Sequence, residues 1–254
     1  MEQQFESLKD VSRPYDSSQL LALNSLVEAI YTGTPQQRVV ANRILSEIKD
    51  HPQAWSRCEE ILLSGQTSLN TKFYSLSIYD SVSSTRWMEL PREKILNTVL
   101  ELIKVVAVRG SHDEKPLLRK LDKVFVNAVK NEWLNGTEMW KSVIPQLASL
   151  SGSDQNLWEN TMNILNMLSE DIFDFGTSTM TAKKIAMLKN TLSEQFPHVQ
   201  QLCEVVLTQY VQSPPNTVKI SLVNAALSTM SHYLKWIPPP VSYTHLTLPT
   251  KRIV

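Results

Sequence analysis

Acidic side chains that occur as close neighbours are the first residues in this sequence that could do chemistry. Glu59 is followed by Glu60, and Glu170 is followed by Asp171, with Asp174 just beyond. Two carboxyl groups that face each other can act as a general acid and a general base. Residues next to each other on a helix point in different directions, so these pairs would not face one another. We therefore interpret them as solvated helix faces or helix caps.

Histidine and cysteine, which serve as nucleophiles, bases and zinc ligands, are scattered along the sequence. Zinc sites need such residues at short spacings, as in CxxC. No such spacing occurs among the five histidines and two cysteines, which are His51, His112, His198, His232, His245, Cys58 and Cys203. The sequence also contains no glycine-bounded nucleophile elbow and no phosphate-binding P-loop. It therefore predicts no enzyme, no metal site and no bound cofactor.

Most tryptophans fall where large aromatic rings usually anchor a core. Apolar stripes or helix ends hold Trp55, Trp140, Trp158, Trp87 and Trp236. Residues 169–175 (SEDIFDF) differ, because Phe173 and Phe175 alternate with Asp171 and Asp174 in a predicted loop. Two interpretations stay open here: the rings fill the seam between neighbouring repeats, or they contact a partner.

Charge and hydropathy exclude several classes of partner. The 25 basic and 25 acidic residues cancel, whereas proteins that follow phosphate backbones or anionic lipid carry an excess of positive charge. We expect no nucleic-acid partner. The sequence shows no signal-type N-terminus and no apolar run near the roughly 20 residues that span a bilayer, which predicts a soluble, intracellular protein without membrane insertion. Cys58 and Cys203 lie on apolar stripes and are predicted to be free buried thiols.

Apolar residues recur at helical spacing along almost the whole sequence, which predicts an all-α protein. Prolines and glycines fall between the apolar runs and mark the turns. Ser17 or Ser18 is expected to cap the first helix, and Thr34 followed by Pro35 the second. The predicted helices span residues 17–31, 34–49, 53–63, 70–86, 91–108, 116–132, 137–150, 154–169, 181–196, 197–211 and 216–236.

Taken two at a time, these helices form pairs that return about every 40 residues, the period of HEAT and armadillo arrays. The predicted fold is a HEAT-repeat alpha-alpha superhelix, a solenoid of about five to six helix pairs, and a globular helical bundle is the alternative. Residues 181–196 and 197–211 are expected to form the fifth pair. The helix at 216–236 would start a sixth pair without a following partner, which leaves its stripe of Leu222, Ala225, Thr229 and Tyr233 uncovered.

Four stretches of the sequence resemble, in the same order and with similar spacing, the opening of the exportin-1 family of nuclear export receptors in the importin-beta (karyopherin) superfamily. They are ANRILSEIKDHPQAWSRCEEIL (41–62), LNTKFYSLSIYDSVSSTRWMELPRE (69–93), ILNMLSEDIFDF (164–175) and YLKWIP (233–238). The sequence departs from the family where a longer aliphatic run usually precedes TRW, since it has Ser81, Ser83 and Ser84 there.

The resemblance implies a division of the sequence into four stretches. Residues 1–16 are predicted to be a flexible N-terminus, residues 17–108 an importin-beta N-terminal module of HEAT repeats, and residues 109–240 exportin-1-like HEAT repeats. After three prolines, Pro238, Pro239 and Pro240, the helical period is lost. Residues 241–254 (VSYTHLTLPTKRIV) are therefore predicted to be a non-native, disordered tail.

The same resemblance implies a protein partner, because receptors of this family bind the GTPase Ran in its GTP state. They do so with the inner helices of their first repeats, which here are the second helices of the pairs, at 34–49, 70–86 and 116–132. Polar residues clear of the apolar stripes of these helices are the implied Ran-binding candidates: Gln37, Arg38, Asn42, Lys72, Asp80, Lys123, Asn127 and Lys130.

Further partners are implied in the same way. Nucleoporins of the nuclear pore are expected to bind, and the protein is expected to shuttle between nucleus and cytoplasm. Cargo with leucine-rich export signals is implied only for the full-length receptor, because later repeats build the cargo groove in this family. The alternative is a HEAT-repeat scaffold that binds other proteins without any GTPase dependence.

Overall fold

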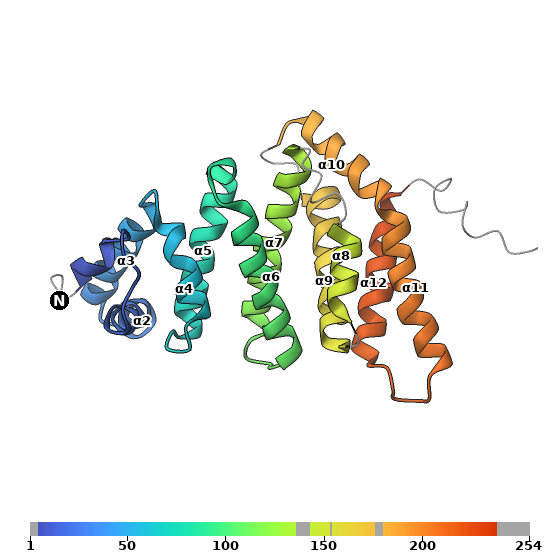
Figure 1. Cartoon of the computed structure of the whole chain (residues 1–254), viewed down its shortest axis with the longest axis horizontal. Coiled ribbons are helices and arrows are strands. Elements are labelled where there is room, and N and C mark those ends of the chain that lie inside the picture. Colours follow the sequence, from blue (N-terminus) through green and yellow to red (C-terminus); the bar gives the residue numbers. More distant parts are fainter. Residues whose placement is uncertain (1–4, 136–142, 153, 176–179, 238–254) are drawn as a thin grey trace, which may run out of the picture. The chain divides into compact units, whose positions relative to one another are not determined.

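A computed structural model describes residues 5–135, 143–152, 154–175 and 180–237. Within these residues every regular element is a helix, and most helices form hairpins that pack on neighbouring hairpins (Figure 1). The chain divides into two compact units, Met1–Ala128 and Val129–Val254. The predicted all-α fold of HEAT-type helix pairs is confirmed. The division falls inside a helix rather than at the polar linker 109–115, where the sequence placed a boundary.

The first unit contains the early hairpins. Its elements are η1 (Glu6–Lys9), α2 (Ser17–Thr32), α3 (Pro35–Asp50), η2 (Ala54–Arg57), α4 (Cys58–Leu63), α5 (Leu69–Arg86), η3 (Trp87–Glu89), α6 (Arg92–Arg109) and most of α7 (Lys115–Asn135). α2 contacts α3 and α5, and α4 contacts α5 and α6. The helix predicted at 53–63 is a 3-10 turn, η2, that continues into the short helix α4.

Helix starts follow the capping residues. The side chain of Asp16, not of Ser17 or Ser18, caps α2, and Gln19 completes a reciprocal capping box. A carboxylate is a strong acceptor at a helix N-terminus, which explains why Asp16 takes this position. Thr34 caps α3 with Pro35 as its first residue, as predicted.

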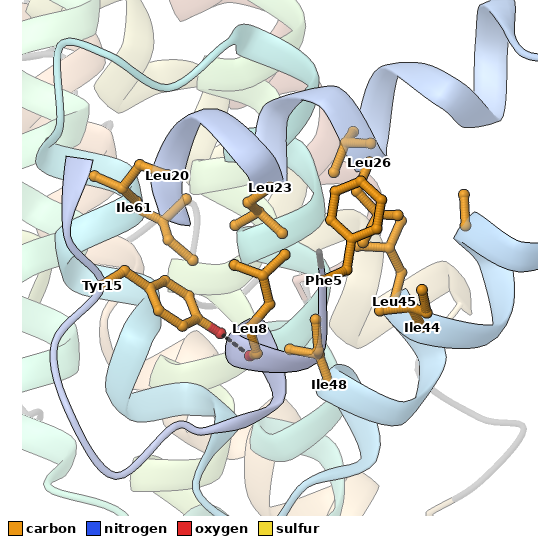
Figure 2. Packing of buried hydrophobic residues seen from close by; sticks show 12 residues of the cluster. Phe5, Leu8, Tyr15, Leu20, Leu23, Leu26, Ile44, Leu45, Ile48 and Ile61 are labelled. Carbon is orange, nitrogen blue, oxygen red and sulfur yellow. Dashed lines mark hydrogen bonds between the residues drawn. The ribbon is translucent and has the colours of Figure 1, made fainter. Parts of the chain in front are cut away.

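The segment 5–15, which we call the N-terminal plug, packs into the first hairpin. Phe5, Leu8 and Tyr15 are buried among residues of α2, α3 and α4 (Figure 2). The Tyr15 hydroxyl donates to the Leu8 carbonyl oxygen at 2.6 Å, and its backbone N–H donates to Glu60 Oε1 at 2.9 Å. The prediction of a flexible segment at 1–16 is therefore wrong for the plug, because its apolar side chains complete the core of the hairpin.

The second unit carries two hairpins and a helix between them. Its elements after α7 are α8 (Val143–Ser151), α9 (Gln155–Glu170), the π-helical turn η5 (Asp171–Phe175), α10 (Ala182–Glu194), α11 (Phe196–Gln212) and α12 (Ile220–Trp236). α8 packs on α9 and α11 packs on α12. α10 contacts η5 and α11 and runs at an angle to the hairpins (Figure 1). The predicted pairing of residues 181–196 with 197–211 is therefore wrong, since α12 is the main partner of α11.

α12 is covered on the face that the sequence left uncovered. It packs against both α9 and α11. The Thr229 hydroxyl donates to the Met162 carbonyl at 3.0 Å, and the Tyr233 hydroxyl donates to the Leu165 carbonyl at 3.2 Å. Leu222, Thr229 and Tyr233 are consequently buried. The expectation that this stripe lies uncovered is wrong, because α12 returns alongside α9 instead of starting a separate pair.

Candidate protein-binding surface

Two of the predicted Ran-binding residues meet in the first unit. Asp80, on α5, faces the side chains of Asn127 and Lys120, both on α7. The Asn127 amide nitrogen donates to Asp80 Oδ1 at 3.0 Å, and the Lys120 ammonium donates to Asp80 Oδ2 at 2.6 Å. Asp80 and Lys120 are about one third exposed. We call these three residues the Asp80 cluster.

The face of α7 explains why these residues meet. Residues three and four positions apart lie on one side of a helix, so Lys120, Lys123 and Asn127 share one stripe of α7. The opposite stripe carries buried apolar residues, including Leu121 and Phe125. Sequence reasoning selected Lys123 and Asn127 but missed Lys120. The spacing of three residues between Lys120 and Lys123 was the signal that could have found it.

Lys72, on α5, lies near a second charged group, which stands at the turn between α6 and α7. Burial lowers the pKa of the Lys72 ammonium, the nearby Arg109 guanidinium lowers it further, and Glu114 opposes both effects. Arg109 Nη1 and Glu114 Oε1 are 3.3 Å apart. Lys72 is thus a half-buried cation near an ion pair in which Arg109 is exposed and Glu114 is partly buried.

The three candidates on α3 have different environments. The Gln37 side chain accepts from the Thr34 N–H at 2.8 Å as part of the capping box. The Arg38 guanidinium donates to the Gly33 carbonyl at 2.8 Å and reaches the Tyr31 carbonyl at 3.4 Å. Gln37 and Arg38 therefore stabilise the turn between α2 and α3. Asn42 is exposed on α3 and is the best placed of the three for a partner.

Lys130 is poorly placed for a partner. It is only 8% exposed and forms an ion pair with Asp171 in the second unit. Taking a charge out of water is costly unless it is paired, and removing one member of such a pair is strongly destabilising. The structure thus assigns Lys130 a role in holding η5, so we do not keep it among the candidate contacts.

The SEDIFDF segment is helical rather than a loop: Ser169 and Glu170 end α9, and Asp171–Phe175 form the π-helical turn η5. The ring of Phe173 is buried and stacks on Trp236 of α12, with centroids 5.7 Å apart and planes 4° from parallel. Lys189 Nζ lies 5.6 Å from the Phe173 ring centre. This packing agrees with the seam interpretation for Phe173. Trp236 is 38% exposed, so it is only a partial core anchor. The side chains of Phe175 and Asp174, and all of Trp140, lie outside the described residues.

Chemistry-bearing residues do not converge elsewhere in the described parts of the chain. No group of three or more histidine, cysteine, aspartate or glutamate side chains could hold a metal ion within those residues. Burial raises the pKa of the Cys58 and Cys203 thiols to about 12, as expected for inert buried thiols. Among the same residues, no helix is both long and apolar enough to cross a bilayer.

A shallow groove between α4 and α6 was also missed by sequence reasoning. It has a volume of about 510 Å³ and lies on the first helices of two successive hairpins. Its lining residues are Glu59, Leu63, Glu93, Lys94, Asn97, Thr98 and Glu101. Lys94 pairs with Glu59 across the groove at 2.6 Å.

Comparison with known proteins identifies the family. Residues 114–248 match the family described as exportin 1-like protein. Exportin-1 of Dictyostelium discoideum is 34% identical over 244 residues, which is 92% of this chain and 21% of that protein. Exportin-1 of Drosophila melanogaster is 35% identical over 235 residues, covering 88% of this chain and 21% of that protein. Exportin-5 of Dictyostelium discoideum is 26% identical over 228 residues, covering 83% and 20%.

The chain spans about a fifth of the length of these relatives. The family match covers more than half of the chain. It also runs past residue 240 into residues 241–254, whose structure lies outside the described residues. The relatives are exportins and not enzymes. The chain therefore belongs to the exportin-1 family of nuclear export receptors, as the resemblance of its four stretches predicted.

Proposed function

We propose that this chain is the N-terminal, Ran-GTP-binding portion of a nuclear export receptor for proteins with leucine-rich export signals. The observation that carries the proposal is its similarity to exportin-1, which extends over 92% of the chain. Because the match covers only 21% of that relative, the activity of a whole receptor is part of the proposal.

The Asp80 cluster supports this proposal in the first unit. It brings candidate residues from two helices, α5 and α7, into one polar, partly exposed group. Such a group is typical of the polar contacts that fix register in a protein interface. We infer that the contact surface comprises Asn42 on α3, Asp80 on α5, and Lys123 and Asn127 on α7, with Lys72 at its edge. Gln37, Arg38 and Lys130 contribute to the fold that carries this surface.

Selectivity for the GTP state follows from the physics of GTPase switches. The terminal phosphate and its magnesium ion order the switch segments, which relax after hydrolysis. A binding surface discriminates between two states only by its differential affinity for them. Side chains fixed by hydrogen bonds, as in the Asp80 cluster, suit the ordered state because they need little rearrangement on binding.

Cargo, nucleoporins and location belong to the same proposal. Export-signal cargo would bind only the full-length receptor, in a groove built by repeats beyond this chain. Nucleoporins would bind the receptor as it shuttles between nucleus and cytoplasm. The chain alone should bind Ran-GTP more weakly than a complete receptor, because part of the interface is missing.

Titration of the whole chain with Ran loaded with GTP or GDP tests the proposal. Preferential binding of the GTP form is the expected result. Addition of a leucine-rich export-signal peptide should leave the affinity unchanged, because coupling between two ligands requires both sites. Equal affinity for the two nucleotide forms would instead support a HEAT-repeat scaffold without GTPase dependence.

A further inference from the structure

The C-terminal end of α12 brings an exposed indole next to the π-helical turn η5. Trp236 is 38% exposed, although its ring stacks on the buried ring of Phe173, with centroids 5.7 Å apart and planes 4° from parallel. An aromatic ring that is already held by a stack loses little freedom when a partner binds. π-helical turns are rare and often occur at functional sites. Together these features make the exposed part of Trp236 a candidate contact for a partner.

Two lysines from different helices converge on the Trp236 ring. Lys235 Nζ, on α12, lies 4.9 Å from the ring centre. Lys189 Nζ, on α10, lies 6.0 Å from the same centre and 5.6 Å from the centre of the Phe173 ring. A cation–π contact attracts an ammonium group but does not neutralise its charge. The exposed indole is therefore flanked by two positive charges.

Carboxylates near this end of α12 are paired with other residues, not with the two lysines. Asp171, on η5, pairs with Lys130. Glu170, at the end of α9, lies 3.6 Å from His232 Nδ1. Among the described side chains, neither of the two lysines forms an ion pair. Like charges held near one another without a counter-charge repel, so a negatively charged ligand would relieve this repulsion.

The chemistry of the group favours the carboxylates of a peptide over phosphate groups. Recognition of phosphopeptides typically uses arginine forks, whereas both cations here are lysines. Single-stranded nucleic acid binds by stacking its bases on free aromatic faces. Phe173 stacks on the indole of Trp236 and Lys235 lies over the same ring, which leaves less ring face for a base. The exposed part of the indole can still contact an apolar side chain.

We propose that Trp236, Lys189 and Lys235 form a binding site for an acidic peptide segment that carries an aromatic side chain between its carboxylates. The lysines contact the carboxylates, and the exposed part of the indole contacts the aromatic side chain. All three residues belong to the second unit, whereas the surface proposed for Ran lies in the first. The inference therefore does not rest on the proposed function.

Calorimetric titration of the whole chain with the peptide EDFDE, acetylated and amidated at its ends, tests the site. We expect binding that weakens as the salt concentration rises. The uncharged analogue QNFNQ and the analogue EDADE, which lacks the aromatic ring, should both bind more weakly. The absence of saturable binding of EDFDE would overturn the proposal. Equal binding of QNFNQ would overturn the role of the lysines, and equal binding of EDADE the role of the indole.

The indole N–H signals in an NMR spectrum locate the contact. The chain has six tryptophans, and the signal of Trp236 is the one that is missing from the spectrum of Trp236→Phe. This signal should move as EDFDE is added, while the other indole signals stay in place. A peptide that saturates the chain without moving the Trp236 signal binds elsewhere, and that result would contradict the proposed site.

Neutral variants test the two lysines. Lys189→Gln and Lys235→Gln should each weaken the binding of EDFDE by about two- to fivefold, as expected for charge contacts at an exposed surface. Lys235→Arg keeps the charge and should recover most of the affinity that Lys235→Gln loses. Lys184→Gln is the matched control, because Lys184 is an exposed lysine of α10 that lies five positions from Lys189 and therefore on a different side of the helix. The control should bind like the wild type.

The remaining outcomes separate this site from general charge effects and from another class of ligand. An equal loss of affinity in Lys184→Gln would show that the net charge of the chain, and not this site, attracts the peptide. Tighter binding of a short oligothymidine strand than of EDFDE would overturn the acidic peptide in favour of single-stranded nucleic acid. Melting curves show whether each variant folds, and the peptide analogues test the site in the unmodified chain.

Discussion

The first hairpin of the first unit and the last hairpin of the second unit differ in how much apolar surface they leave exposed. The α2–α3 hairpin is covered by the N-terminal plug, whose Leu8 side chain is fully buried. On α12, by contrast, Ile220, Leu227 and Leu234 are 58%, 50% and 46% exposed. These three residues are seven positions apart and therefore form one stripe along the helix.

This difference shows that apolar content does not decide which segments are covered. The plug belongs to a mostly polar stretch, yet its few apolar residues fill the space beside α2 and α3 (Figure 2). α12 has apolar residues on two faces, and only the face toward α9 and α11 is covered. In repeat arrays each hairpin contacts only its neighbours, so a helix face that no neighbour covers stays exposed unless a separate segment packs against it.

The largest expected effect on stability comes from a substitution in the N-terminal plug, which covers the α2–α3 hairpin. Leu8→Ala should lower the free energy of unfolding by about 2–5 kcal/mol, because it leaves a cavity where a fully buried side chain was. Leu21→Ala on α2 is the control: Leu21 is exposed, so its loss should cost within about 0.5 kcal/mol. Urea unfolding of the two variants measures the difference. Equal shifts would mean that the plug does not belong to the core.

Alkaline pH should lower the folding stability of the first unit more than that of the second. Burial raises the pKa of Tyr15, Tyr74 and Tyr79 in the first unit, but only of Tyr233 among the described residues of the second. A tyrosine with a raised folded-state pKa contributes stability that is fully present below about pH 10 and is lost above it. Each such tyrosine should cost about 1.4 kcal/mol per pH unit there.

Unfolding in urea between pH 8 and pH 11 measures this loss. The pH dependence above pH 10 should decrease in Tyr15→Phe and in Tyr79→Phe, because phenylalanine does not ionise. Tyr31→Phe is the control, because the Tyr31 side chain on α2 is exposed rather than buried. A wild-type chain whose stability is constant up to pH 11 would contradict the burial of these hydroxyl groups.

A smaller effect separates two of the buried tyrosine hydroxyl groups that bond to backbone carbonyls, those of Tyr15 and Tyr233. Tyr15 donates to the Leu8 carbonyl at 2.6 Å and Tyr233 to the Leu165 carbonyl at 3.2 Å. Each phenylalanine variant should lose about 0.5–1.5 kcal/mol at neutral pH, and the shorter bond of Tyr15 should account for the larger loss. Thermal unfolding at pH 7 compares them. A larger loss for Tyr233→Phe would show that the plug is the looser of the two regions.

The sequence predicted helices well and pairings less well, for a physical reason. Helical period, the Thr34 cap and the Pro35 start are local, and all are found in the structure. The partner of α12 depends on the chain reversal at residues 213–219, where Asn216 adopts a left-handed conformation with φ of 67°. Asparagine tolerates the left-handed conformation, but a single Asn in a sequence does not predict that the chain adopts it there.

The candidate site was predictable to a similar extent. Asp80 and Asn127 were identified from their place on helix faces, but their contact depends on how α5 and α7 pack, and this is not a local property. The ion pair between Lys130 and Asp171 links residues 41 positions apart. Helical period alone therefore placed Lys130 on a polar face, whereas packing buries it.

The last prediction concerns the exposed stripe of α12 and has the smallest effect on stability. Leu227→Gln and Leu234→Gln together should change the free energy of unfolding by less than about 1 kcal/mol, because both side chains are about half exposed. They should nevertheless reduce self-association, since contiguous exposed apolar residues favour it. We expect the wild-type chain to associate as its concentration rises, and sedimentation velocity measures this directly.

Val39→Gln is the control, because Val39 is an exposed apolar residue on α3 and lies away from the stripe. Association that persists in the double variant but disappears in Val39→Gln would place the self-association surface on the first hairpin and not on α12. A strictly monomeric wild-type chain at high concentration would show that the α12 stripe is too narrow to hold a second copy.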